Sequence, residues 1–229
     1  NQLTNLDLSS NNFLRTLICN GNQLTNLDLS SNNFLRTLLC EDNQLTSLDL
    51  SQNLSLDHLD CEYNQLTNID VNNLDSLTRL NCRGNQLINL DLSANYALTF
   101  LHCGYNQLTN LDLRNHQLNT FTGGVGAGLI TTGNYQLFCI DVDDPSLAQI
   151  FAPSLFNLDP WTSFDTNCAV ALGCLDSLAC NYDSIATIND NSCIYLPVSV
   201  NNSYVTCSNF TDATLTVSSS TGMYTFLWS

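Results

Sequence analysis

The sequence contains no lysine, and no arginine follows Arg114, so the second half of the chain carries neither residue. The chain has five arginines and 21 acidic residues, which gives a formal net charge of −16 at pH 7. Nucleic-acid binding depends on Lys and Arg side chains that neutralise phosphates, so this composition excludes nucleic acid as a partner. An anionic membrane surface is an equally poor partner for such a chain.

Long apolar runs are also missing. No segment approaches the roughly 20 apolar residues that span a bilayer, so we expect no direct membrane insertion. The chain has no secretion signal, starts partway through a repeat and stops inside an expected strand at Ser229. We therefore expect a fragment of a longer protein, for which a missing signal says nothing about compartment.

The most prominent feature of the chain is a repeat. The tripeptide Asn-Gln-Leu recurs every 21 residues without a slip, at Asn1, Asn22, Asn43, Asn64, Asn85 and Asn106. A strict period of this length is typical of a stacked solenoid. Each block holds two Leu-x-x-Leu-x-(Leu/Cys) patterns 10 or 11 residues apart, which leaves no room for a helix between them. We expect two short strands per coil, with parallel sheets on both flanks.

These residues resemble a known family. The pattern Leu-x-x-Leu-Asp-Leu-Ser-x-Asn, followed by Leu-x-x-Leu-x-Cys-x-x-Asn-Gln-Leu, is similar to the short 21-residue class of bacterial leucine-rich repeats over residues 1 to about 142. The resemblance implies a β-rich leucine-rich-repeat solenoid with almost no helix, used for binding. It does not imply a particular ligand.

The 11 cysteines fall into two groups, of which the first follows the repeat. We expect its members to form a core ladder of reduced, buried thiols, about 4.8 Å apart from coil to coil. Disulfides between neighbours are an alternative for which the parallel Cβ bonds are badly aligned. A soft-metal strip is a second alternative, and it lacks further ligands in the core. The ladder consists of Cys19, Cys40, Cys61, Cys82 and Cys103.

The second group of cysteines lies in a turn-rich region of low charge. Clustered cysteines in such segments usually form disulfides in an oxidising exterior. No Cys-x-x-Cys pair occurs, which argues against a zinc ribbon or a thioredoxin-like motif. The group consists of Cys139, Cys168, Cys174, Cys180, Cys193 and Cys207.

A last coil and a cap follow the Gly-rich insertion at 123–128, because residues 136–142 align with residues 2–8. In that register Cys139 occupies an outward slot, from which it can bond to Cys168. Between them, Asp144 and Pro145 predict the start of a short helix over residues 146–151. A solenoid end must cover its leucines and its open strand edge. Residues 136–168 are expected to do so, and they are similar to the cap of secreted members of the repeat family.

Two small modules are expected after the cap. Residues 173–193 resemble a Cys-rich module of secreted Bacteroidetes proteins, which implies a disulfide knot; we expect Cys174 and Cys193 to be disulfide-bonded. Calcium is a weaker alternative, since the EF-hand spacing is not met. Its candidate ligands are Asp176, Asp183, Asn189 and Asp190. Residues 205–228 resemble the first strands of a β-sandwich repeat from gliding-motility and surface adhesins.

The expected domain boundaries follow from these segments. The solenoid spans 1–135, the last coil and cap 136–170, the Cys-rich module 171–196 and a truncated β-sandwich repeat 197–229.

The two halves of each coil differ in how much their outward residues vary. The first halves repeat an Asp row, which either serves structure and solubility or binds cations: Asp7, Asp28, Asp49, Asp70, Asp91, Asp112 and Asp141. The second halves change from coil to coil, which favours recognition. The ligand-binding candidates lie there: His58, Asp60, Glu62, Arg79, Asn81, Arg83, Phe100, His102 and Tyr105.

Among these candidates Arg79 and Arg83 are expected to matter most, because an anionic or hydroxyl-rich ligand would find its best donors there. The alternative is that the two arginines merely neutralise Asp60, Glu62 and Asp75.

Catalysis is not expected from this sequence. His102 and Cys103 are adjacent on an expected strand, so their side chains point to opposite faces and cannot form a nucleophile–base pair. His58 and His102 lie two coils, roughly 10 Å, apart, which is too far for shared metal ligation. The glycines at 123–128 lack the strand-to-helix context of a phosphate-binding loop.

The sequence as a whole predicts an extracellular or cell-surface recognition and adhesion module that binds a protein or a carbohydrate through the variable strands. A non-catalytic targeting region of a larger secreted hydrolase is the first alternative, and a passive spacer is the second. No cofactor is expected, apart from the possible calcium.

Overall fold

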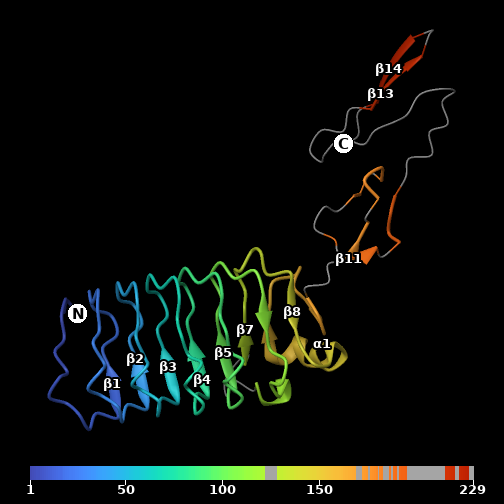
Figure 1. Ribbon diagram of the computed structural model, residues 1–229. Helices are drawn as coiled ribbons and strands as arrows, with labels where there is room; N and C mark the ends of the chain where they lie inside the picture. Colours follow the sequence, from blue (N-terminus) through green and yellow to red (C-terminus); the bar gives the residue numbers. More distant parts are fainter. Residues whose placement is uncertain are drawn as a thin grey trace. The chain divides into compact units, whose positions relative to one another are not determined.

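The computed structural model describes residues 1–121, 128–168, 172–174, 176–179, 181–182, 186, 188–189, 191–194, 215–219 and 222–226. The chain divides into two compact units, Asn1–Cys168 and Ala169–Ser229. The first unit contains the repeats, and its strands lie side by side along the solenoid (Figure 1). The expected segments at 123–127, and Cys180 and Cys207, lie outside the described residues.

The second half of each coil contributes one strand to a seven-stranded parallel sheet. The register is constant, so that Leu17, Leu38, Leu59, Leu80 and Leu101 are successive partners. Each strand has a buried centre between two outward residues, because side chains alternate across a strand. In spatial order the strands are β1 (Thr16–Ile18), β2 (Thr37–Leu39), β3 (His58–Asp60), β4 (Arg79–Asn81), β5 (Phe100–His102), β7 (Leu129–Ile130) and β9 (Phe156–Asn157).

The expectation of two strands per coil is wrong for most of the solenoid, because the first halves of most coils form no strand. Strands form on this flank only near the C-terminal end, where β6 (Leu111–Asp112), β8 (Cys139–Asp141) and β10 (Ser163–Asp165) make a three-stranded parallel sheet. In the earlier coils the same positions have no strand assignment, and a turn follows them, closed by hydrogen bonds such as Asn11 N–H to the Leu8 carbonyl at 2.9 Å. The fold class itself, a leucine-rich-repeat β-solenoid with almost no helix, is confirmed.

Leucines from both halves of every coil fill the core, and the cysteine ladder lies among them. All five ladder cysteines are reduced and buried, which confirms the prediction. Two thiols donate weak hydrogen bonds to the next coil: Cys40 to the carbonyl of Asp60 and Cys61 to that of Asn81. Burial raises the pKa of the Cys103 thiol to about 12 and that of the Cys19 thiol to about 11. These thiols therefore act as small apolar side chains.

The asparagine that opens each block ties neighbouring coils together. The side-chain amide of Asn64 donates to the carbonyls of Cys40 and Cys61, both at 3.1 Å. Its Oδ1 accepts from the backbone N–H of Leu45 in the preceding coil, at 2.9 Å. The same bonds recur in the other coils, at Asn43, Asn85 and Asn106. These buried amides satisfy backbone groups that the short strands leave unpaired.

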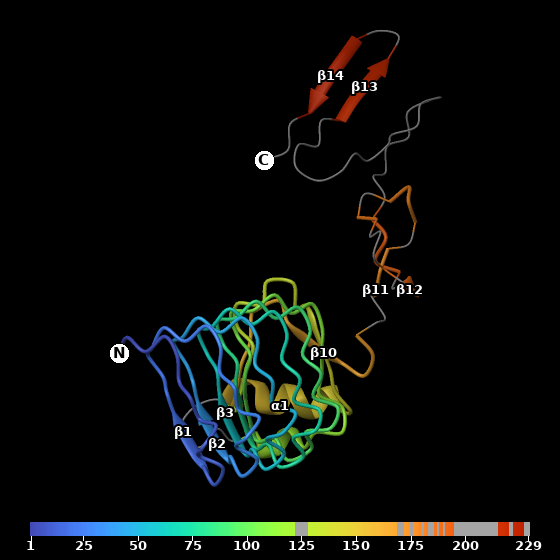
Figure 2. The ribbon, with the colours of Figure 1, turned by 60° about the vertical axis from the view of Figure 1, so that its left-hand side comes forward.

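The cap closes the C-terminal end of the solenoid, where Figure 2 shows α1 (Pro145–Leu155) behind the stacked coils. Asp144 caps this helix, since its Oδ1 accepts from Ser146 N–H at 2.9 Å and from Leu147 N–H at 3.1 Å. The helix is longer than the expected 146–151, and a short 3-10 helix, η1 (Leu118–Thr120), precedes it in the chain. Phe156 and Phe164 are buried against the core.

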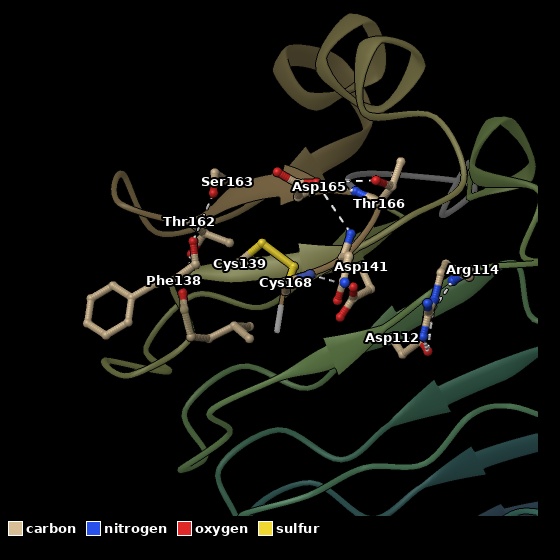
Figure 3. The surroundings of a disulfide bond; sticks show 12 residues. Asp112, Arg114, Phe138, Cys139, Asp141, Thr162, Ser163, Asp165, Thr166 and Cys168 are labelled. Carbon is tan, nitrogen blue, oxygen red and sulfur yellow. Dashed lines mark hydrogen bonds and ion pairs between the residues drawn. A yellow bond between two sulfur atoms is a disulfide. The ribbon is translucent and has the colours of Figure 1, made fainter. Parts of the chain in front are cut away.

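The expected disulfide between Cys139 and Cys168 is present and joins the first residue of β8 to the end of the cap (Figure 3). Beside it, the carboxylate of Asp141 accepts from Cys168 N–H at 2.7 Å, and Asp141 is buried. Asp141 therefore departs from the exposed Asp row in which the sequence places it. β10 pairs in register with β8, so the disulfide and the sheet hold the same two segments.

The described residues of the second unit form two short pairs of strands. β11 (Leu172–Gly173) pairs in parallel with β12 (Ile188–Asn189), and β13 (Leu215–Ser219) pairs antiparallel with β14 (Gly222–Phe226). Cys174 and Cys193 form a disulfide, which confirms that both are bonded. The likeness of this unit to Bacteroidetes and adhesin modules stays a prediction.

Replacing Asn64 by Ala should destabilise the solenoid by about 2 kcal/mol, because it leaves the buried Leu45 N–H without a partner and removes one of the two amide donors to each of the Cys40 and Cys61 carbonyls. Urea unfolding of the full chain measures this loss. Asn68→Ala is the matched control, since Asn68 is an exposed residue of the same coil. Equal midpoints for the two variants would contradict the role given to Asn64.

Replacing both Cys139 and Cys168 by Ser should destabilise the cap by about 3 to 4 kcal/mol on the loop-entropy model. We expect faster hydrogen exchange in β8 and β10 before any change in β1 to β3. The control, Cys174→Ser with Cys193→Ser, should leave exchange in the solenoid as it is in the parent. An unchanged melting curve and unchanged exchange in the first variant would show that the bond does not stabilise the cap.

Candidate ligand-binding face

The nine candidate residues of the sequence lie together on the outward side of β3, β4 and β5 and in the turns that follow these strands. The register places Arg79 between His58 and Phe100, and Asn81 between Asp60 and His102. We call these nine residues, together with Glu41 and Tyr63, the variable face. Neighbouring residues in such a row are about 4.8 Å apart, so side chains from adjacent coils meet.

Both arginines of this face stack on aromatic rings. The guanidinium carbon of Arg79 lies 4.3 Å from the ring centroid of Phe100. That of Arg83 lies between two rings, 4.8 Å from the centroid of Tyr63 and 4.8 Å from that of Tyr105. Within the described part of the chain the only ion pair is Arg114 with Asp112. Among the described residues Arg79 and Arg83 therefore form no direct ion pair with Asp60, Glu62 or Asp75, and cation–π contacts hold them instead. Neutralisation of these acids at longer range stays a prediction.

A second group of side chains on the face is acidic. The amide of Asn81 donates to Asp60 at 3.0 Å and to Glu62 at 3.1 Å, and so bridges the two carboxylates. Glu41 extends the group by one coil. Burial raises the pKa of Glu41, and the charges of Asp60 and Glu62 raise it further. Glu41 was not among the candidates, although its place in the repeat, one coil before Glu62, could have indicated it.

The last position of each repeat shapes the turn beside this face. It always has a positive φ, which only glycine adopts without cost. Tyr63 and Tyr105 nevertheless occupy it, at φ 49° and 54°. Each tyrosine ring lies over a glycine of the following coil: a Cβ on Gly84 would come within 2.6 Å of the Tyr63 ring, and one on Gly133 within 2.9 Å of the Tyr105 ring. The alternation Tyr63, Gly84, Tyr105, Gly133 over the last four of these positions was the sequence signal for this arrangement, and Asp42 occupies the same position in an earlier coil.

The two histidines of the face are held in their neutral form. Burial lowers the pKa of His102 to about 4, and the charge of Arg83 adds to the effect. Burial likewise lowers the pKa of His58, with a contribution from Arg79. Cys103, the neighbour of His102, is fully buried in the core, so the two side chains lie on opposite sides of the strand as predicted.

The Asp row on the opposite half of the coils closes turns. In each coil Oδ1 of the aspartate accepts from the backbone N–H two residues on, at 3.0 Å from Ser9 to Asp7 and 2.9 Å from Ser51 to Asp49. These hydrogen bonds lower the pKa of Asp7 and Asp49. The arrangement agrees with the structural role expected for the row, and cation binding by it stays a prediction.

The calcium candidates of the second unit are only partly described. Asp183 and Asp190 lie outside the described residues, and of Asn189 only the backbone is described. Asp176 Oδ1 accepts from Leu178 N–H at 2.9 Å. Among the side chains that the structure describes, no three His, Cys, Asp or Glu residues gather as metal ligands would. No helix in the described ranges is long and apolar enough to cross a membrane.

Comparisons with known proteins place this geometry among bacterial leucine-rich-repeat structures. No family model and no curated protein matches the chain. The chain is similar to the functional domain of InlJ from Listeria monocytogenes, which is described as including a cysteine ladder. The identity is 30%, the TM-score is 0.54, and the match covers 71% of this chain and 38% of that one.

Two further structures match less closely. One is an internalin, InlF, from Listeria monocytogenes, with 22% identity, a TM-score of 0.38 and coverage of 61% of this chain and 35% of that one. The other is a leucine-rich-repeat protein from Leptospira interrogans, with 19% identity, a TM-score of 0.41 and coverage of 69% of this chain and 44% of that one. The chain spans less than half the length of each of the three structures. Its fold defines it as a leucine-rich-repeat solenoid with a cysteine ladder.

Replacing His102 by Gln should protect the fold against acid. Between its ordinary pKa of 6.5 and the folded value of about 4, the unfolded chain takes up a proton on His102 that the folded chain does not. Acidification through this window therefore destabilises the parent. We expect the variant to gain about 1 kcal/mol relative to the parent between pH 7 and pH 4, a value reduced by solvent screening of this partly exposed group. Urea unfolding at both pH values measures it, and a constant difference would contradict the assignment.

Proposed function

We propose that this chain is a non-catalytic recognition module of an extracellular or cell-surface protein, and that it binds a protein ligand through the variable face. The two disulfides support an oxidising compartment, since such bonds persist outside the cytosol. The similarity to the functional domain of InlJ supports a function carried by the repeats themselves.

The distribution of charge on the face is the observation that carries the proposal. Glu41, Asp60 and Glu62 lie in two consecutive coils, and Arg79 and Arg83 lie in the next. Charges of opposite sign therefore lie one coil apart, yet the arginines are stacked on rings rather than paired with the acids. A protein surface with a complementary pattern of charges can satisfy both groups at once, which favours specific over general attraction.

The stacking also favours a protein over a carbohydrate. Sugar binding by aromatic residues needs an open ring face, because the sugar lies flat on the ring. On this surface Phe100 faces Arg79, and Tyr105 lies between Arg83 and Gly133. Each of these rings thus has protein atoms against a ring face. A targeting region or a passive spacer does not require such an arrangement.

Substituting both Arg79 and Arg83 by Ala should weaken ligand binding at least tenfold, since buried or preorganised arginines are common binding hot spots. The test screens the full chain against an array of extracellular proteins and, in parallel, a glycan array, and then measures affinities for each hit. A matched control carries Asn26→Ala and Asn68→Ala, two exposed residues of the first halves of the coils.

Loss of protein binding in the arginine variant alone, with an unchanged circular dichroism spectrum, is the expected outcome. Equal affinities of parent, arginine variant and control would exclude the variable face. Binding to glycans without any protein hit would replace the proposed ligand class.

A further inference from the structure

We propose that Arg83, clamped between Tyr63 and Tyr105, is the subsite for a carboxylate side chain, Asp or Glu, of the protein ligand. This inference rests on the proposed function and adds the chemistry that one point of the face recognises.

The clamp restricts how a ligand can approach Arg83. Tyrosine rings lie on both sides of the guanidinium, each with its centroid 4.8 Å from the central carbon. A partner can therefore reach only the in-plane N–H groups. Nε is buried and has no hydrogen-bond partner among the described residues, which leaves the two terminal nitrogens as the donors open to a ligand. Two parallel N–H groups in one plane match the two oxygens of a carboxylate.

The position of the guanidinium is fixed by the repeat. Gly84 and Gly133 leave room for the two rings, which any larger residue would displace. The tyrosines keep these seats although their φ angles of 49° and 54° are unfavourable for a residue with a Cβ. A side chain held in this way loses little conformational freedom when it binds, so a larger part of the interaction energy becomes affinity.

Arg114 shows what an arginine of this chain does when a carboxylate is within reach. Its Nε and Nη2 both donate to the carboxylate of Asp112, two residues before it. Arg83 has no such partner among the described residues, although Asp60 and Glu62 lie in the neighbouring coil. Asn81 holds these two acids through its own amide. The bidentate position on Arg83 thus remains open to a carboxylate from outside.

The surrounding charge selects among anions. Asp60, Glu62 and the net charge of −16 repel any anion, and they repel a doubly charged phosphate or a polyanion more than a single carboxylate. A carboxylate that is accompanied by a basic residue can pair with Arg83 through the first group and with Asp60 or Glu62 through the second. The expected ligand segment therefore carries an acidic side chain next to a basic one.

The test follows the Arg83 side-chain signals by NMR while a capped Gly-Glu-Gly peptide is added to the full chain. The matched peptide is capped Gly-Gln-Gly, which keeps the shape and loses the charge. Glucuronate and inorganic phosphate serve as probes of the other anion classes. The variants are Arg83→Ala, Arg83→Lys and Tyr63→Leu with Tyr105→Leu, and Arg36→Ala is the control at an exposed arginine elsewhere.

We expect a saturable shift with the Glu peptide and at least fivefold weaker binding of the Gln peptide. Binding of the Glu peptide to the variants is followed on backbone signals of β4 and β5. The Arg83→Ala variant should not bind this peptide. The peptide should bind at least threefold more weakly to Arg83→Lys and to the double tyrosine variant, and equally to Arg36→Ala. Equal binding of both peptides, or retention of binding in Arg83→Ala, would overturn the subsite, as would tighter binding of phosphate or glucuronate.

The outcomes separate this inference from the proposed function. A protein ligand that is lost on substitution of Arg79 and Arg83, without carboxylate binding at Arg83, would remove the subsite and keep the face. Carboxylate binding at Arg83 without any protein ligand in the screen would keep the subsite chemistry and remove the proposed function.

Discussion

The buried asparagine that opens each inner block is the constraint on which the rest of the structure depends. A second buried row, Asn32, Asn53 and Asn95, bonds to carbonyls of the preceding coil. The strands of the main sheet have at most three residues, so most backbone groups of a coil cannot pair within a strand ladder. The asparagine amide replaces those missing partners by bonding to carbonyls of two coils and to an N–H of the preceding coil. A fixed bond between coils gives a fixed register, and the register decides which outward side chains meet.

The proposed recognition surface follows from a separation between the inside and the outside of the coil. Leucines and thiols repeat inside with little variation, and the buried thiols contribute volume without demanding polar partners. Outside, substitutions are free to change sign and size from one coil to the next. Arg83 illustrates the result, because its neighbours Tyr63 and Tyr105 come from the coil before and the coil after. A cluster of residues 20 or more positions apart in the chain thus becomes one preorganised group.

Much of this architecture could be predicted from the sequence, because a 21-residue period determines the contacts between coils. The buried cysteine ladder and the bond from Cys139 to Cys168 follow from that register, and the Asp144 cap follows from the pair Asp144 and Pro145. The first halves of the first five coils were predicted wrongly as strands. There the aspartate binds the N–H two residues on, and the Leu8 carbonyl accepts from Asn11, so turns consume the groups that a second ladder would need.

The details of the face could be predicted less well. The sequence indicated which strands vary, but the seat of Tyr63 over Gly84 depends on a backbone angle that tyrosine rarely adopts. The sequence offered a ligand or the acids Asp60, Glu62 and Asp75 as partners of Arg83, and it did not indicate the stacking on Tyr63 and Tyr105. Direct geometry between side chains of different coils decided this point, and composition carries no information about it.

Native-state hydrogen exchange tests the central claim most directly at the backbone N–H groups that donate to the Oδ1 atoms of the asparagines. The N–H groups of Leu24, Leu45, Leu66 and Leu87 lie outside the strands and donate to a side-chain oxygen of the next coil. If the asparagines hold the coils together, these amides exchange as slowly as those of Leu38, Leu59 and Leu80 at the strand centres. Exchange as fast as that of an exposed turn would contradict this account.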